Sequence, residues 1–167
     1  MEIERRSDNN EPTAVLQDLV RGLSIMRTLQ DVALLVARTT RALTAADGVT
    51  VVLREGDLCH YLEEDAVSDL WKGQRFPAQS CISGWCIRTG QPAIIPDVFA
   101  DERIPHDVYR RTFVHGMVMV PVGQGKAIAA LGAYWGSGQA IDPKVVEQLV
   151  AVSSILRPHL APMDASG

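Results

Sequence analysis

The sequence of 167 residues predicts a single α+β domain in which an antiparallel sheet carries helices on one face. Apolar residues recur at helical spacing near both ends of the chain, and two segments between them have the pattern of a β-hairpin. Strands and helices do not alternate as βαβ units, and no repeat of 20 to 50 residues is visible, which excludes a solenoid. An apolar fraction of 47% is sufficient for one core.

Two helices are expected before the first strand. Residues 1–12 are polar and end at Pro12, so we expect a flexible leader there. The first helix is predicted from Thr13, as its N-cap, to Arg27. The second is predicted to be capped by Asp31 and to end before the turn at residues 47–48.

The middle of the chain changes to the period of strands. Residues 49–53 and 58–62 form the first predicted hairpin, followed over 65–80 by a loop with at most one helical turn. Residues 81–89 are expected to form a short helix that Gly90 ends, with a strand at 93–95 after it.

The remaining elements complete the predicted sheet. Residues 97–113 are too polar for a core and are expected to form a structured lid with a short helix. The second hairpin is predicted at 116–122 and 127–135. Asp142 followed by Pro143 indicates the start of a last helix, which continues until Pro158 interferes, and residues 161–167 are expected to be a flexible tail.

Composition narrows the class of protein. A net charge of −4 gives no general attraction for nucleic acid or anionic lipid, and the longest apolar runs are shorter than the roughly 20 residues of a membrane span. The N-terminus has no apolar signal core, so a cytoplasmic location is expected. The three cysteines (Cys59, Cys81 and Cys86) are expected to be reduced.

The segment from Trp71 to Trp135 resembles the GAF domains that proteobacterial sensor histidine kinases and phytochrome-related signalling proteins carry. The matching stretches are LWKGQRFP (70–77), CISGW (81–85), PAIIPD (92–97), ADERIPHDVYR (100–110), TFV (112–114), MVMVPV (117–122) and GAYW (132–135). The resemblance implies an α+β fold with about six antiparallel strands, with the N- and C-terminal helices on one face and a cover of loops and short helices over a pocket on the other. It places this single domain at residues 13–160.

The resemblance also implies a sensory or regulatory function that depends on a small ligand. Aromatic side chains gather in the segments expected to cover the pocket, which suits an apolar cavity or a core filled by these side chains. Arg103, Arg110 and Arg111 stand near His106 and His115, where they can receive a small anion or pair with neighbouring acids. The candidate pocket residues are Trp71, Phe76, Cys81, Trp85, Asp97, His106, Tyr109, Thr112, Phe113 and His115.

Two alternative functions rest on related GAF proteins. Phytochrome-like domains attach a bilin to a lid cysteine, but no cysteine lies between Asp97 and His115, which argues against covalent bilin binding. Free methionine-(R)-sulfoxide reductases need neighbouring cysteines, whereas Cys81 and Cys86 point to different sides of a helix. A haem held by His106 or His115 is a further alternative. No set of residues has the spacing of a metal site or of an acid/base pair. The sequence therefore does not identify a cofactor.

The terminal helices are the other candidate for function. Their apolar faces are broad enough to cover the sheet and also to contact a second copy of the chain. We therefore expect a homodimer that signals through these helices to a histidine kinase or another output protein, or else a pure protein-interaction module. The residues predicted to form the dimer contact are Leu16, Leu19, Leu23, Met26, Val146, Leu149, Val150 and Leu156.

Overall fold

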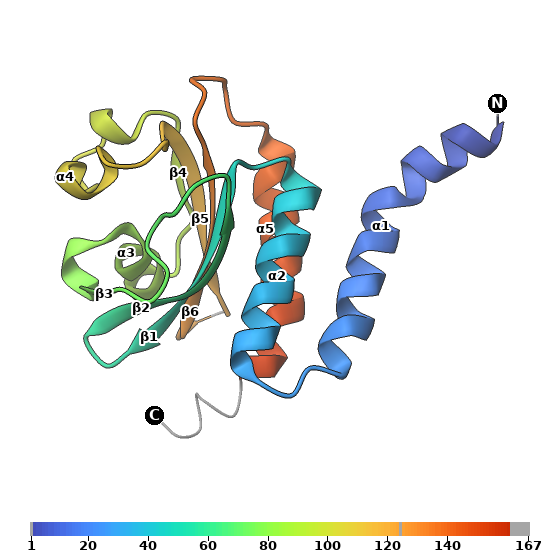
Figure 1. Ribbon diagram of the computed structural model, residues 1–167, viewed down its shortest axis with the longest axis horizontal. Coiled ribbons are helices and arrows are strands. Elements are labelled where there is room, and N and C mark those ends of the chain that lie inside the picture. The colour runs from blue at the N-terminus through green and yellow to red at the C-terminus, as the bar shows by residue number, and fades with distance from the viewer. Residues whose placement is uncertain (1, 124, 161–167) are drawn as a thin grey trace.

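Six strands form one antiparallel sheet in the order β3-β2-β1-β6-β5-β4 (Figure 1). The computed structural model describes residues 2–123 and 125–160, so the predicted tail at 161–167 lies outside the described residues. The predicted α+β fold with six antiparallel strands is confirmed. The strands are β1 (Gly48–Glu55), β2 (Leu58–Ala66), β3 (Arg75–Pro77), β4 (Ala93–Ile95), β5 (Gly116–Val122) and β6 (Ala129–Trp135).

Helices α2 (Leu29–Thr44) and α5 (Pro143–Leu156) cover one face of the sheet (Figure 1). Their apolar sides meet residues of β1, β5 and β6 in a continuous core that includes Val36, Leu149 and Leu131. As predicted, Asp142 caps α5 by accepting the backbone N–H of Lys144, and Pro143 occupies the first turn. A turn of 3-10 helix, η3 (Arg157–Leu160), follows α5.

Helix α1 (Glu2–Ser24) lies outside this layer and packs against α2 (Figure 1). It begins at Glu2, which corrects the start predicted at Thr13. Pro12 lies inside the helix, and Figure 1 shows α1 bent, as an internal proline predicts. The polar residues that suggested a flexible leader include several with good helix propensity, and their backbone is helical.

The cap of α2 also differs from the prediction. Thr28, with extended backbone angles, is the N-cap, and its hydroxyl accepts the backbone N–H of Asp31. Asp31 lies in the first helical turn, where a negative charge is favourable next to the helix N-terminus.

The other face of the sheet carries the cover. It consists of α3 (Ile82–Thr89), α4 (His106–Tyr109) and two turns of 3-10 helix, η1 (Ala78–Ser80) and η2 (Val98–Ala100). Gly90 ends α3 in the left-handed conformation with φ of 68°, as predicted. Gly84 allows α3 to pack on η1, because a Cβ atom there would lie 1.9 Å from the carbonyl oxygen of Ala78.

Strand β3 is absent from the sequence prediction, which placed a loop over residues 65–80. It has three residues and pairs with β2 alone, with Cys59 opposite Phe76. A strand this short shows no alternation of apolar and polar residues, so its pairing depends on β2 and not on a local pattern.

A β-bulge in β2 controls which side chains reach each face. Val51 is opposite Glu63 and Val52 is opposite Tyr61, so Leu62 is the extra residue. The bulge changes the phase of alternation: Tyr61 belongs to the core under the cover, whereas Leu62 belongs to the core under α2 and α5. Glu63 then accepts a hydrogen bond from Gln30 Nε2 of α2 at 3.0 Å.

Glu64, the next residue, holds the loop that leads to β3. Its carboxylate accepts the backbone N–H groups of Leu70, Trp71 and Lys72, each at 2.8 Å. These three donors would otherwise lack a partner, because residues 70–72 belong to no helix or strand. Lys72 also forms an ion pair with Glu63, with Nζ 2.8 Å from Oε1.

We expect Glu64→Gln to lower the free energy of unfolding by roughly 1.5–3 kcal/mol, the typical contribution of hydrogen bonds to a charged group. The amide nitrogen of glutamine is a donor, so it cannot accept from the loop. Urea denaturation followed by circular dichroism measures the change. Glu102→Gln is the control, because Glu102 is exposed and its replacement should change stability by at most about 0.5 kcal/mol. Equal stability of the two variants would contradict a structural role for Glu64.

Candidate functional site

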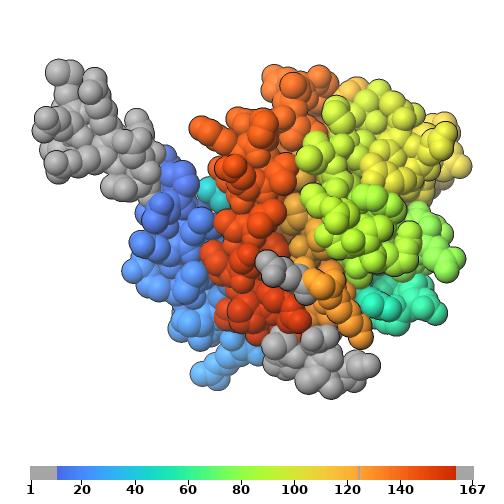
Figure 2. All heavy atoms as spheres, turned by 180° about the vertical axis from the view of Figure 1, so that it is seen from behind, coloured from blue at the N-terminus to red at the C-terminus, as the bar shows by residue number. Residues whose placement is uncertain are grey.

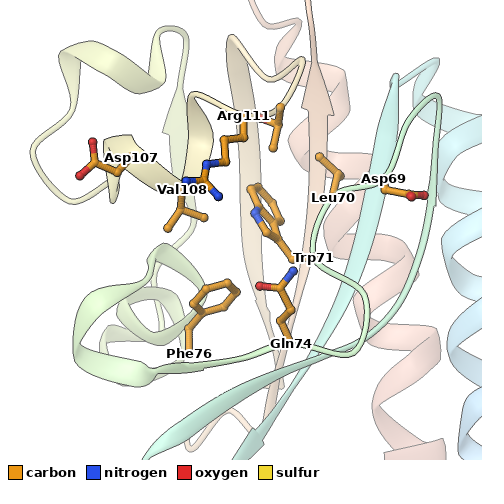
Figure 3. A pocket seen from close by; sticks show the side chains of 9 residues that line it. Asp69, Leu70, Trp71, Gln74, Phe76, Asp107, Val108 and Arg111 are labelled. Atoms are coloured by element: carbon orange, nitrogen blue, oxygen red, sulfur yellow. The ribbon is translucent and has the colours of Figure 1, made fainter.

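A cavity of about 370 Å³ opens between the loop before β3 and the segment that contains α4 (Figure 3). One wall comes from the loop that Glu64 holds, and the other comes from the lid. The lining residues are Asp69, Leu70, Trp71, Gln74, Phe76, Asp107, Val108, Arg111 and Thr112.

Trp71 forms the floor of the cavity. Only 4% of its surface is exposed, and its backbone N–H is fixed by Glu64. Behind it the ring meets Tyr109 at 4.7 Å and Tyr134 at 5.5 Å between centroids. The space between the sheet and the cover is therefore filled by aromatic side chains, and the cavity remains on the outer side of Trp71.

The tyrosine hydroxyls behind Trp71 are in hydrogen-bonding contact with neutral partners. Tyr134 lies 2.9 Å from the hydroxyl of Thr50, Tyr61 lies 3.1 Å from the hydroxyl of Ser83, and Tyr109 donates to the sulfur of Met117. Burial raises the pKa of all three tyrosines above the ordinary value. These groups stay protonated at neutral pH, so they can donate hydrogen bonds but cannot act as bases.

Arg111 supplies a positive charge at the cavity. Figure 3 shows its guanidinium group directed toward Trp71, whereas the carboxylates of Asp69 and Asp107 point away from the centre. Asp107 pairs instead with Arg110, with Nη1 2.7 Å from Oδ1. Among residues 2–123 and 125–160, Arg111 has no ion pair. Its five N–H donors are therefore available to an anion.

The structure brings only part of the predicted pocket together. Trp71, Phe76 and Thr112 line the cavity, while Tyr109 and Phe113 belong to the apolar core under the cover. The sequence feature that indicated a pocket was the concentration of aromatic residues in the cover segments. The residues that the prediction missed are Asp69, Leu70, Gln74, Asp107, Val108 and Arg111, of which Arg111 was considered only as part of an arginine cluster.

The other predicted pocket residues do not line this cavity. Asp97 caps η2 by accepting the N–H of Phe99, and His106 Nε2 lies 2.9 Å from the carbonyl oxygen of Asp101. Trp85 packs under the guanidinium of Arg103. Neither Cys81 nor His115 lines the cavity.

The arginine cluster of the lid divides among separate partners. Arg103 forms two hydrogen bonds to Asp101, at 3.0 and 2.6 Å, and its guanidinium lies 4.3 Å from the ring centroid of Trp85. The contact with Arg103 lowers the pKa of Asp101 below its ordinary value. This pairing holds the lid against α3, and it leaves Arg111 as the arginine that faces the cavity.

The two cysteines that are nearest in the sequence, Cys81 and Cys86, have different surroundings in the structure. Cys59 and Cys81 both belong to the buried core under the cover, and Cys81 Sγ lies 3.3 Å from the hydroxyl of Ser83. Cys86 donates to the backbone oxygen of Met119 at 3.6 Å. The hydrogen-bonding contacts of Cys81 and Cys86 are therefore with different partners, Ser83 and Met119.

Within residues 2–123 and 125–160, no three histidine, cysteine, aspartate or glutamate side chains lie together in a way that could hold a metal ion. In the same residues, every helix is too short or too polar to cross a bilayer.

The chain thus consists of a six-stranded antiparallel sheet with helices α2 and α5 on one face and a cover of short helices and loops on the other. The GAF domain family model matches residues 26–157, and the chain belongs to this family. No curated protein sequence gives a match.

Solved structures with the same fold have diverse functions. The GAF domain of an Acinetobacter phosphoenolpyruvate-protein phosphotransferase is 15% identical with a TM-score of 0.81, covering 95% of this chain and 97% of that one. The free methionine-R-sulfoxide reductase of Neisseria meningitidis, solved with its substrate, is 15% identical with a TM-score of 0.77, covering 93% and 92%. The chromophore-binding domain of a bacteriophytochrome from R. palustris is 14% identical with a TM-score of 0.73, covering 95% and 62%. At these identities the likeness establishes the fold.

We expect Asp101→Asn to destabilise the protein at neutral pH and to lose this effect in acid. The folded-state pKa of Asp101 lies below its ordinary value of 3.8, so its contribution is complete above that pH and is lost as the pH falls through the folded value. Urea midpoints of both proteins between pH 7 and about pH 3 measure the difference. Asp107→Asn is the control, because its carboxylate is 93% exposed. A difference that stays constant with pH would contradict this role for Asp101.

Proposed function

We propose that this GAF domain is a sensor that binds a small anion with an apolar portion in the cavity between Trp71 and Arg111. The observation that carries the proposal is the guanidinium of Arg111, which has no ion pair among the described residues and points toward Trp71 (Figure 3). A guanidinium group binds carboxylates and phosphates through two parallel hydrogen bonds. Phe76, Leu70 and Val108 provide apolar walls, and Gln74 provides an amide that can fix the orientation of the ligand.

The same geometry supports binding without catalysis. The tyrosines behind Trp71 are held protonated, and the carboxylates at the cavity point away from its centre (Figure 3). No pair of groups there is arranged as a general acid and base within the described residues. The three free thiols suit a reducing compartment, which is consistent with the predicted cytoplasmic location.

A thermal-shift panel tests the ligand class. It contains short carboxylates, phosphate monoesters including nucleotides, inorganic anions and tetrapyrroles. We expect an anion to raise the melting temperature of the wild type, because binding to the folded state alone stabilises it. In Arg111→Gln the affinity should fall roughly 10- to 100-fold, equivalent to about 1.5–3 kcal/mol for charged hydrogen bonds.

Lys126→Gln is the matched control, because it removes one positive charge at an exposed residue that does not line the cavity. It should keep the affinity of the wild type. A panel in which no compound shifts the wild type would favour a pure interaction module. Equal losses in both variants would contradict a specific role for Arg111.

The proposed output is a homodimer formed through α1 and α5, which lie on one face of the molecule (Figure 2). The structure changes the predicted contact residues. Leu19, Leu23, Leu149 and Leu156 are at most 1% exposed and belong to the core of this chain, so they cannot contact a second copy. Leu16, Met26 and Val146 are partly buried against the same core. Val20 of α1 and Val150 of α5, exposed at 50% and 48%, are available for a contact, as is Ile25 directly after α1, which is 74% exposed.

We expect native mass spectrometry to show a dimer for the wild type and a monomer for the double variant Val20→Glu, Val150→Glu. Glutamate at a buried contact would carry an unpaired charge, which disfavours association. Val67→Glu is the control, because Val67 is 59% exposed and follows β2, so it belongs to neither helix. A wild-type protein that stays monomeric at high concentration would remove the basis for helical output to a histidine kinase.

A further inference from the structure

A second cavity, of about 380 Å³, lies between the β1–β2 hairpin and one side of α3. It shares no lining residue with the cavity at Trp71 and Arg111. Its walls come from the end of β1, the hairpin turn, η1 and α3. The charged residues that line it are Arg54, Asp57 and Arg88, so its wall carries two positive charges and one negative charge.

Arg88 reaches this cavity because α3 packs closely on η1. A Cβ atom at Gly84 would lie 1.9 Å from the carbonyl oxygen of Ala78, so the close approach requires glycine. Arg88 follows Gly84 by one helical turn, which places both residues on the same side of α3. Its guanidinium donates from Nη1 to the same carbonyl oxygen of Ala78 at 3.1 Å. This hydrogen bond fixes the guanidinium of Arg88 at the wall of the cavity.

Arg54 lines the cavity from the hairpin side. It is opposite Cys59 in the pairing of β1 with β2, and Cys59 belongs to the core under the cover. Residues directly opposite each other on paired strands share a face of the sheet, so Arg54 lies on the face of the cover. Its Nε donates to the backbone oxygen of Gly56 in the hairpin turn at 3.2 Å. A hydrogen bond to the backbone therefore holds this guanidinium as well.

No carboxylate neutralises either arginine in the part of the chain that the structure describes. The ion pairs found there include neither Arg54 nor Arg88, and the exposed Asp57 has none. Each guanidinium has five N–H donors, of which the backbone takes one. Two positive charges on the wall of one cavity repel each other, and an anion bound between them replaces this repulsion with attraction.

We propose that the cavity between Arg54 and Arg88 binds the phosphoryl group of a small soluble molecule. A phosphate monoester carries nearly two negative charges at neutral pH and three strong acceptor oxygens, which suit two guanidinium groups. A monocarboxylate has one charge and two oxygens, so it matches a single guanidinium. The hydroxyl of Ser80 and the amide of Gln79 provide further donors, and Ile87 provides an apolar contact for the rest of the molecule.

The experiment titrates the isotope-labelled full chain with phenyl phosphate and follows the backbone amides by NMR, with sodium chloride holding the ionic strength constant. We expect saturable shifts at Gly56, Ser80 and Gly84, which line the cavity. Arg54→Gln and Arg88→Gln should each weaken this binding about tenfold, because each removes charge-assisted hydrogen bonds. Both arginines are exposed, so the variants should keep the fold, which circular dichroism checks.

Three further variants separate this site from general charge and from the first cavity. Asp57→Asn should strengthen binding about twofold, because it removes the negative charge of the wall. Arg38→Gln is the matched control, because Arg38 is exposed on α2, on the other face of the sheet. Arg111→Gln should also keep the affinity, since Arg111 lines only the first cavity. An equal loss in Arg38→Gln, or shifts that occur only around Arg111, would overturn the proposal.

Benzoate tests the preference for a phosphoryl group in the wild type itself. It carries the same ring as phenyl phosphate but a single carboxylate, so it should bind at the amides of this cavity about tenfold more weakly. Equal affinity of the two compounds there would contradict recognition of a phosphoryl group. Vesicles of phosphatidylcholine that contain phosphatidic acid test a lipid as its source. We expect the wild type, with a net charge of −4, to remain in the supernatant when they are sedimented. Sedimentation that depends on Arg54 and Arg88 would contradict a soluble ligand.

Discussion

The arrangement of the cover depends on one interaction, the acceptance of three backbone N–H groups by the carboxylate of Glu64. Residues 70–72 have no strand or helix to satisfy their donors, so this carboxylate replaces a secondary-structure partner. The same hydrogen bonds fix Trp71. The ring of Trp71 fills the space next to Tyr109 and Tyr134 and forms the floor of the cavity on its outer side. The position of Glu64 depends on the β-bulge at Leu62, because the extra residue changes the face of the sheet to which the side chains after it in β2 point.

Elements that depend on local chemistry could be predicted from the sequence. Asp142 with Pro143 starts α5 and Gly90 ends α3, because caps require particular residues at particular backbone angles. The two hairpins were predicted for the same reason. Elements that depend on distant partners could not be predicted. β3 exists because β2 pairs with it, and the helical backbone before Thr13 is not indicated by any apolar period.

The candidate site shows the same division. Aromatic residues in the cover segments indicated an apolar site, and Trp71 and Phe76 were found there. Which arginine faces the cavity could not be predicted, because Arg103, Arg110 and Arg111 are equivalent in the sequence until the positions of Asp101, Asp107 and Trp85 are known. That Cys59 and Cys81 share one buried core could not be predicted either, since Cys59 lies on β2 and Cys81 lies at the start of α3.

Glu63 connects the two faces of the fold. One buried carboxylate is held at the same time by Gln30 at the start of α2 and by Lys72 at the end of the Trp71 loop. The loop that borders the cavity and the helix layer thus share a common anchor at the edge of the sheet. The contacts that the loop and α2 make with this carboxylate are therefore energetically linked, because losing either one leaves a buried charge with fewer partners.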